Sequence, residues 1–206
     1  IMSAALQAQE KERKRISEAL HDSVAQLLYG IRLNLQNYNR TAPLTESFNN
    51  INSLLDQAIN ETRNISFELA PSILNDFGLI ESVNEMARRL TTDNFSIEVK
   101  TQGLKTRLKP DLEISSFRII QELVNNCIKH SNATKACIKI NIAKESIILT
   151  VSDNGTGFNV KNSDYLMQGS GLLSIKNRVG LFNGSLEIKE GKDNGIIVEV
   201  MLRTEN

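Results

Sequence analysis

Apolar residues in the first seventy positions recur at the spacings typical of α-helices. Residues 4 to 40 carry this pattern with almost no helix-breaking residue, and Pro43 follows in a short loop where it can open a second helix. In that second helix the seam positions alternate at steps of four and three residues, namely Leu44, Phe48, Ile51, Leu55, Ala58, Thr62, Ile65 and Leu69. Two such helices form an antiparallel hairpin, which alone cannot cover both its apolar faces. We therefore expect a homodimer in which two hairpins make a four-helix bundle.

Beyond Pro71 the pattern changes to a mixture of helices and strands. A linker is followed by a helix at residues 79–91, and the helical period returns over residues 111–130. Alternating or β-branched runs predict strands at residues 95–103, 135–142, 146–152, 184–189 and 196–202. This order is typical of an α+β domain with helices on one face of a mixed sheet. We place the boundary near residues 71–78, which gives domains 1–72 and 73–206.

Composition and charge narrow the possible partners. Among the 206 residues, 40% are hydrophobic, which is enough for a core, and the formal net charge is zero. A neutral chain lacks the basic footprint of proteins that bind nucleic acid or anionic membranes, so we expect neither partner. The two cysteines, Cys127 and Cys137, make no disulfide framework, and their spacing fits no metal signature. This cysteine usage favours a reducing compartment.

Targeting features lead to an expectation about location. No apolar run approaches about 18 residues, the length of a membrane span, and no signal peptide opens the chain. We therefore expect a cytoplasmic chain without direct membrane contact. The chain begins with Ile1 and Met2, so we interpret it as a fragment that can be cut from a membrane-anchored protein.

The segment EALHDSVAQLL, residues 18–28, gathers three side chains that suit phosphoryl chemistry. At about 100° per residue, His21 lies just off the apolar seam of the first helix. Asp22 and Gln26 are i and i+4 neighbours, so their side chains can reach the same small volume. An imidazole, a carboxylate and an amide on one solvent-facing strip indicate transfer of a phosphoryl group. The alternative is an ordinary histidine at the boundary of an apolar stripe.

The end of the 111–130 helix carries a second group of polar residues. Glu122 and Asn126 project carboxylate and amide oxygens from one face, and Lys129 and His130 follow at the terminus. Hard oxygen ligands with a nearby cation suit Mg²⁺ bound to a phosphate chain. The alternative is an ordinary helix end on which Lys129 offsets the helix dipole.

Two glycine-rich segments complete the candidate nucleotide site. In VSDNGTGF a strand ends in Asp153, which can accept a hydrogen bond from an adenine amino group, and Gly155 and Gly157 let the backbone approach a ligand. In GSGLLSIKNRV, Gly169 and Gly171 precede a helix whose N-terminal amides can attract phosphate. Asp-Asn-Gly is also a common turn sequence, so the prediction depends on the order of all three segments.

Taken in order, these segments resemble the cytoplasmic core of a two-component sensor histidine kinase, over nearly the whole chain. The branch is the one that pairs with NarL-type response regulators. ERKRISEALHDSVAQLL is similar to the phosphoacceptor box of that branch, and LAPSILNDFGL to its junction with the catalytic domain. The N-box and the two glycine boxes of the GHKL ATPase fold, also seen in gyrase and Hsp90, resemble QELVNNCIKHS, DNGTGF and GSGLLSIKNRV. The resemblance implies a dimerisation and phosphotransfer domain at 1–72 and a GHKL-type α/β sandwich that binds ATP at 73–206.

The roles of the site residues follow from this resemblance. His21 would accept the phosphoryl group, and Asp22 would hold the imidazole and act as base. Gln26 would orient the water that attacks the phosphoaspartate of a regulator. In the second domain, Asn126 would ligate Mg²⁺ with help from Glu122. The other positions implied in ATP binding are Lys129 on phosphate, Asp153 on adenine, and His130, Gly155, Gly157, Gly169, Gly171 and Leu172.

The implied activity is that of an ATP-dependent histidine autokinase. It would pass the phosphoryl group to an aspartate of a response regulator and act as a phosphatase of that regulator through Asp22 and Gln26. One position departs from the family, because Ile196 stands where a Thr usually contributes to the adenine site. Two alternatives stay open: a phosphatase-dominant protein, and a non-catalytic dimeric signalling scaffold with a weakened ATP site. Other ATPases of this fold, and kinases that phosphorylate Ser, do not need the first 70 residues.

Overall fold

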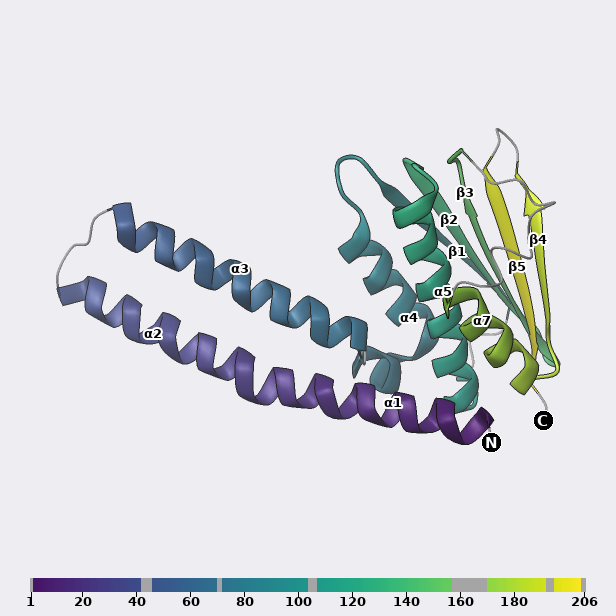
Figure 1. Cartoon of the computed structure of the whole chain (residues 1–206), viewed down its shortest axis with the longest axis horizontal. Coiled ribbons are helices and arrows are strands. Elements are labelled where there is room, and N and C mark those ends of the chain that lie inside the picture. Colours follow the sequence, from purple (N-terminus) through teal and green to yellow (C-terminus); the bar gives the residue numbers. More distant parts are fainter. Residues whose placement is uncertain are drawn as a thin grey trace. The chain divides into compact units, whose positions relative to one another are not determined.

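The chain divides into two compact units, Ile1–Ser72 and Ile73–Asn206, in a computed structural model (Figure 1). The structure describes residues 2–41, 46–69, 72–103, 107–156, 170–191 and 195–204. The first unit is helical and the second combines helices with a sheet, as the change of sequence period predicts. The dimerisation and catalytic roles given to the two domains remain predictions.

The helical unit is an antiparallel hairpin, which confirms the predicted arrangement. One arm consists of α1, Met2–Ala19, and α2, Gln26–Thr41, joined by a six-residue π-helix η1, Leu20–Ala25. The other arm is α3, Glu46–Leu69, and it packs along α1, η1 and α2 (Figure 1). Pro43 and Leu44, predicted to lie at the turn, are outside the described residues.

The π-helix is the main departure from the sequence prediction in this unit. The prediction counted 100° per residue, as in an α-helix, through the whole first arm. In a π-helix the backbone bonds run from residue i to residue i+5, so residues four apart no longer lie directly above one another. The expected sharing of one small volume by Asp22 and Gln26 therefore loses its geometric basis and stays a prediction.

Burial within the hairpin follows the predicted seam only in part: Thr62 is buried and Leu55, Ala58 and Leu69 are half-buried, whereas Ile51 and Ile65 are exposed. Ile59 and Phe67 of α3 are buried, and so is Ala25 of η1. Ser17 and Ser66 connect the two arms by hydrogen bonds. The hydroxyl of Ser17 donates to the Ser66 carbonyl at 2.9 Å, and the hydroxyl of Ser66 donates to the Ser17 carbonyl at 3.2 Å. A second set of apolar side chains stays exposed on the single chain, namely Val24, Leu27, Ile31, Leu33, Ile51, Leu54 and Ile65.

The second unit opens with α4, Ser72–Leu90, where the sequence predicted a linker up to residue 78. That prediction was wrong for residues 72–77, which are helical, and the chain kinks at Gly78, whose φ is 85°. The guanidinium of Arg107 donates to the carbonyls of Leu74 and Asn75 at 3.2 Å and of Asp76 at 3.4 Å. A helix end leaves such carbonyls without intrahelical partners, so Arg107 stabilises this short helical segment.

The remaining elements follow the predicted order closely. They are β1, Ser96–Gly103; α5, Pro110–His130; β2, Lys135–Ile142; β3, Ser146–Asp153; α7, Ser170–Leu181; β4, Ser185–Glu190; and β5, Ile196–Arg203. The predicted strand and helix limits differ from these by one or two residues at most, apart from α4. The prediction that Gly171 precedes the last helix was wrong, because α7 begins at Ser170 and Gly171 lies in its first turn. The α+β class expected from the sequence is confirmed.

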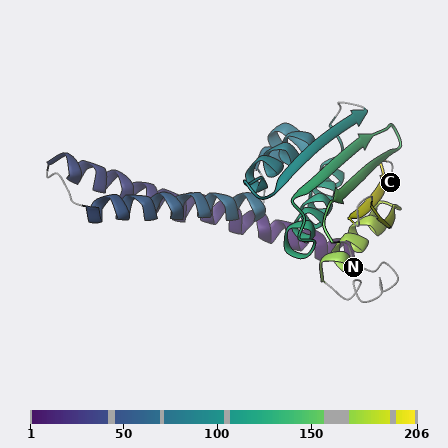
Figure 2. The ribbon, with the colours of Figure 1, turned by 90° about the horizontal axis from the view of Figure 1, so that it is seen from above.

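The sheet has the strand order β1-β2-β3-β5-β4. The pair β1 and β2 is parallel and the other neighbours are antiparallel, which confirms a mixed sheet. Helices α4, α5 and α7 cover one face of this sheet, as Figure 1 and the view from above in Figure 2 both show. Alternate strand residues such as Ile138, Leu149 and Val200 are buried, and so are Phe117 and Ile120 of α5, which packs on β2 and β3.

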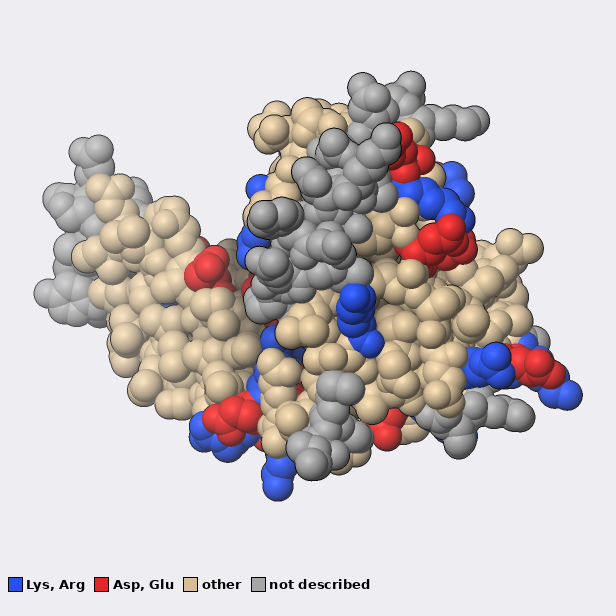
Figure 3. Space-filling view, turned by 45° about the vertical axis from the view of Figure 1, so that its right-hand side comes forward, with Lys and Arg blue, Asp and Glu red and all other residues tan. Residues whose placement is uncertain are grey.

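Surface charges are intermingled in sign. On the face drawn in Figure 3, Lys or Arg side chains lie next to Asp or Glu side chains in several places. Two ion pairs on the strands follow this pattern, Lys100 with Glu98 and Lys189 with Glu187. The described helices are each too short or too polar to traverse a lipid bilayer.

Candidate functional site

His21 lies in η1 with its imidazole against the neighbouring Asp22. The distance between His21 Nδ1 and Asp22 Oδ1 is 3.0 Å, and both side chains are 70% exposed. When Nδ1 carries the proton it donates to the carboxylate, and this hydrogen bond fixes the tautomer that leaves Nε2 with its lone pair. π-Helical turns of this kind occur frequently at functional sites.

Gln26 follows as the first residue of α2. Its side chain is exposed, and its backbone N–H bonds to the carbonyl of Ser23 at the end of the π-helix. The structure therefore leaves its amide accessible to a partner or water, and its predicted role remains a prediction.

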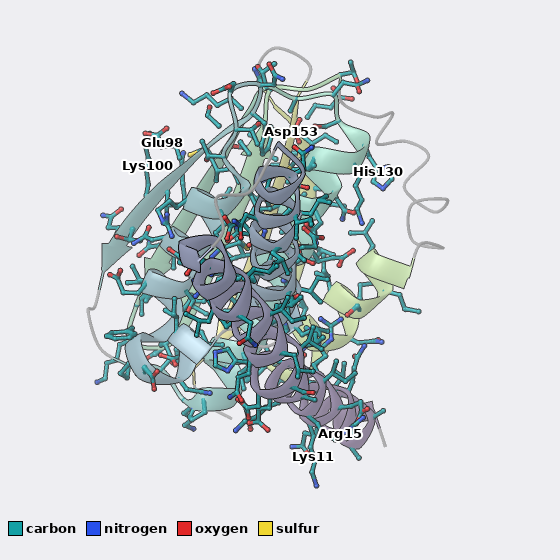
Figure 4. All side chains as sticks on the ribbon, turned by 90° about the vertical axis from the view of Figure 1, so that its left-hand side faces the viewer. Lys11, Arg15, Glu98, Lys100, His130 and Asp153 are labelled. Carbon is teal, nitrogen blue, oxygen red and sulfur yellow. The ribbon has the colours of Figure 1, made fainter. Side chains whose placement is uncertain are left out.

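The last turns of α5 present the second group of predicted residues. Glu122 and Asn126 are both partly exposed, one helical turn apart in a regular α-helix. Lys129 and His130 are exposed in the last turn. Figure 4 labels His130 at the end of α5 and Asp153, which ends β3.

Asp153 is held by hydrogen bonds on both carboxylate oxygens. The backbone N–H of Gly155 donates to Oδ1 at 2.8 Å, and the Cys127 thiol donates to Oδ2 at 3.6 Å. Burial raises the pKa of the Cys127 thiol to about 12, and the negative charge of Asp153 adds to the shift. The thiol therefore stays protonated and can donate at neutral pH. Sequence reasoning placed Cys127 only in an apolar segment and missed this contact.

Gly155 has a structural reason for being a glycine that the sequence did not reveal. A Cβ atom at this position would collide with the carbonyl of Ser131, just beyond α5. The same carbonyl accepts the backbone N–H of Thr156 at 2.8 Å. The bare backbone of Gly155 therefore allows the end of β3 to pack on the end of α5, and the role of Gly155 in admitting a ligand stays a prediction.

Glu122 and Gly171 are brought together from α5 and the first turn of α7. The Oε1 atom of Glu122 occupies the space that a Cβ atom on Gly171 would take. Leu172, also predicted for nucleotide binding, lies partly exposed in the same turn. Gly157 and Gly169 lie outside the described residues, so their predicted roles are not addressed.

Asn154 is a second residue that sequence reasoning missed. Its side-chain oxygen accepts the backbone N–H groups of Thr134 and Lys135 at 3.0 and 2.8 Å. These bonds tie the end of β3 to the start of β2 and so fix the position of Asp153.

A hollow of about 520 Å³ beside Gly103 and Ile142 is separate from the candidate nucleotide site, because it lies at the other end of β2.

Two known families match different parts of the chain, and the first match ends within two residues of the boundary between the two units. Residues 12–74 match the family described as histidine kinase. Residues 111–206 match the family described as histidine kinase-, DNA gyrase B-, and HSP90-like ATPase. The first match contains His21, Asp22 and Gln26, and the second contains Asn126 and Asp153.

Two curated relatives align over almost the whole chain. The signal transduction histidine-protein kinase/phosphatase DegS of Bacillus subtilis is 33% identical over 210 residues, covering 96% of this chain and 54% of the relative. The oxygen sensor histidine kinase NreB of Staphylococcus carnosus is 31% identical over 203 residues, covering 96% of this chain and 58% of the relative. The chain thus spans little more than half the length of the curated relatives it matches.

Solved structures share the fold at lower identity. The histidine kinase domain of the blue-light activated histidine kinase from Erythrobacter litoralis superposes with a TM-score of 0.53 at 13% identity, over 84% of this chain and 95% of that chain. The histidine kinase AdeS of Acinetobacter baumannii gives a TM-score of 0.50 at 17% identity, over 91% of this chain and 98% of that chain. The sequence matches and the shared fold agree: the chain is homologous to the histidine kinases DegS and NreB and carries a region of the histidine kinase family followed by a region of the ATPase family.

Proposed function

We propose that this chain is an ATP-dependent histidine autokinase that phosphorylates His21 and passes the phosphoryl group to an aspartate of a response regulator. The observation that carries the proposal is the exposed pair of His21 and Asp22, whose Nδ1 and Oδ1 atoms lie 3.0 Å apart. The second unit of the same chain matches an ATPase family. The chain therefore offers both a region to bind ATP, the phosphoryl donor, and His21 as the phosphoryl acceptor.

The chemistry assigned to the pair is a direct phosphoryl transfer. The Nε2 lone pair of His21 forms a bond to the γ-phosphorus of ATP, and the bond to the bridging oxygen breaks, so that ADP leaves with the electron pair. Positive charge develops on the imidazole during attack, and the Asp22 carboxylate at Nδ1 stabilises it. Phosphoryl transfer depends mainly on such positioning and on charge neutralisation.

The nucleotide is assigned to the end of α5, the end of β3 and the start of α7. Asp153 has a carboxylate fixed at a strand end, with lone pairs left to accept an adenine amino group. Lys129 and His130 are exposed in the last turn of α5 and suit phosphate, and the α7 N-terminal turn suits an anion.

The donor set also fits Mg²⁺. Asn126 and Glu122 supply the oxygen atoms of an amide and a carboxylate from one helical face, and Mg²⁺ bound with phosphates needs only one or two protein ligands. When bound, the ion supplies neutralisation of the charge on the phosphate chain. Asn126 and Glu122 are therefore the residues assigned to hold it.

The partners proposed are a second copy of the chain and a NarL-type response regulator. Exposed apolar residues of the hairpin, among them Leu27, Ile31 and Leu54, support a homodimer with a four-helix bundle. In the reverse direction, Asp22 and Gln26 would act on the regulator's phosphoaspartate, with Gln26 orienting water. The relative DegS is a histidine-protein kinase/phosphatase, which supports this second activity.

One observation favours a second candidate, a phosphatase-dominant or non-catalytic dimeric scaffold. Ile196 is 8% exposed. It lies opposite Asp153 in the antiparallel register of β3 and β5, because Ser152 pairs with Ile197. Its side chain has no polar atom to offer a nucleotide, which is consistent with a weakened adenine site.

Point variants of the two histidines test the proposal. The chain contains only His21 and His130, so incubation with γ-labelled ATP and Mg²⁺ has two possible histidine acceptors. We expect His21→Ala to abolish labelling while ATP binding is retained. Label that persists in His21→Ala and is lost in His130→Ala would contradict the assignment. ATP binding without label in the unmodified chain would favour the scaffold.

A further inference from the structure

Cys127 lies in the last turns of α5 and faces the end of β3. Its side chain is 7% exposed, and its Sγ atom is 3.6 Å from Oδ2 of Asp153. The carbonyl of Cys127 accepts both the backbone N–H of Ser131 at 3.3 Å and its hydroxyl at 2.7 Å. The thiol is therefore presented from an anchored helix end.

The neighbours of Asp153 in the sheet offer no comparable donor. Ala136 pairs with Asp153 on β2, and Ile196 is the next position of the β5 ladder after the Ser152–Ile197 pair. Residues directly opposite in antiparallel strands point to the same face, and both of these side chains are purely hydrocarbon. Within the described part of the chain, the donors on Asp153 are the Gly155 N–H at Oδ1 and the Cys127 thiol at Oδ2.

These two donors act differently. The Gly155 N–H belongs to the backbone turn and is present whatever side chains surround it. The thiol comes from a different element and binds the other oxygen, so it sets the rotation of the carboxylate about its own axis. A carboxylate oxygen has two lone-pair sites, so Oδ2 can accept the thiol and still accept a second N–H from a ligand.

We propose that Cys127 is a positioning residue that orients Asp153 for a purine base carrying an exocyclic amino group and thereby sets the base specificity of the nucleotide site. The proposal rests on the proposed function, because it takes Asp153 as the base-reading group. It goes beyond that function because discrimination for the amino group would depend on a thiol that does not itself contact the nucleotide.

The test compares the dissociation constants of two nucleotides by calorimetry on the whole chain. One is ATP, and the other is purine riboside triphosphate, which lacks the 6-amino group. Cys127→Ala removes the thiol, Cys127→Ser keeps a donor at the same position, and Asp153→Asn removes the acceptor. Cys137→Ala is the matched control, because Cys137 is the other free cysteine and alternates to the opposite face of β2.

We expect the unmodified chain and Cys137→Ala to prefer ATP to the same degree. In Cys127→Ala the preference for ATP should fall by about fivefold, the effect of one ordinary hydrogen bond, with little change for purine riboside triphosphate. Cys127→Ser should keep the preference within about twofold of the unmodified chain.

Two outcomes would overturn the proposal. The first is a Cys127→Ala variant with an unchanged preference, and the second is a Cys127→Ser variant that loses as much preference as Cys127→Ala, which would indicate packing. The Asp153→Asn variant separates these outcomes from failure of the proposed function. If Asp153→Asn binds ATP normally, the nucleotide site itself is misassigned; if it loses ATP while Cys127→Ala does not, only the role of Cys127 fails.

Discussion

The carboxylate of Glu122 fills the space left by the missing side chain of Gly171, so that α5 and the first turn of α7 interlock at one point. A negative charge beside the first turn of a helix is electrostatically favourable. Because Glu122 is also assigned to Mg²⁺, the absence of a Cβ at position 171 controls where a candidate metal ligand can lie.

We predict that Gly171→Ala weakens nucleotide binding by about fivefold, the effect of one lost polar contact. The added methyl group has to displace the Glu122 carboxylate, and with it one of the two oxygen donors assigned to Mg²⁺. Titration of the folded chain with Mg²⁺ and ATP measures the effect. Gly180→Ala is the matched control, because it lies in the same helix with nothing within 4 Å of its added Cβ.

The control variant should bind nucleotide normally and gain about 0.5–1 kcal/mol of stability, since Ala is the better helix former. A Gly171→Ala variant that binds as well as Gly180→Ala would contradict the interlock. In a Glu122→Ala background the space is already empty, so adding Gly171→Ala should produce no further loss.

Arg107 and Glu113 form the next testable pair. Arg107 donates to both carboxylate oxygens of Glu113, at 2.9 and 2.8 Å, and the Glu113 side chain is only 4% exposed. We predict that Arg107→Met lowers the free energy of unfolding of the second unit by about 1–3 kcal/mol, because a buried carboxylate loses its partner. Urea denaturation with hydrogen exchange on second-unit peptides provides the measurement.

Lys100→Met serves as the comparison for that prediction. Lys100 pairs with Glu98 on β1, where the two side chains are 56% and 45% exposed (Figure 4). Solvent screening limits such a pair to less than about 1 kcal/mol. Equal losses in the two variants would mean that the Arg107 bonds do not stabilise the kinked start of α4.

Gln26 gives a prediction that separates the two activities. We expect Gln26→Ala to leave autophosphorylation near the level of the unmodified chain and to slow dephosphorylation of the phosphorylated regulator about tenfold or more. The reason is that an exposed amide at the start of α2 can orient water but is not required for attack by His21. If both rates fell together, Gln26 would instead support the helix itself.

Cys127 should resist alkylation. Its pKa of about 12, against 9.0 for an ordinary thiol, lowers the thiolate fraction near pH 8 roughly a thousandfold. Iodoacetamide followed by peptide mass spectrometry should therefore modify Cys137 well before Cys127 in the folded chain. Equal rates at both cysteines would contradict the buried, protonated thiol.

The same shift predicts a pH dependence of stability. The folded pKa is raised above the unfolded one, so the contribution of the protonated thiol is complete below pH 9 and is lost as the pH rises toward 12. Cys127→Ala should lose less stability than the unmodified chain over this interval. Parallel stability curves for the two proteins would contradict the prediction.

Much of the fold could be predicted because hydrophobic periods are local. The alternation in β2 and β3 and the 3.6-residue period of α5 correspond directly to buried faces in the structure. The helical segment 72–77 could not be found this way, because its carbonyls depend on Arg107, some thirty residues away in sequence. The π-helix at His21 was missed for another reason, since a π-turn changes the angular step without changing composition.

The candidate site was predictable residue by residue but not contact by contact. Residue type and spacing were enough to predict Glu122, Asn126 and Asp153 as site residues. Side-chain contacts across elements, such as Cys127 with Asp153, depend on how α5 lies against β3. An apolar helix position that holds Cys instead of a hydrocarbon was the available signal.

The most direct test of the central claim is the chemical stability of the phosphoryl bond. The chain is incubated with γ-³²P-ATP and Mg²⁺, denatured, and divided between acid and alkali. The account predicts label that is lost in acid, survives in alkali and maps to the peptide containing His21, as expected for a phosphorus–nitrogen bond. Label that survives acid, as a serine or threonine ester does, or label on a peptide without His21, would contradict it.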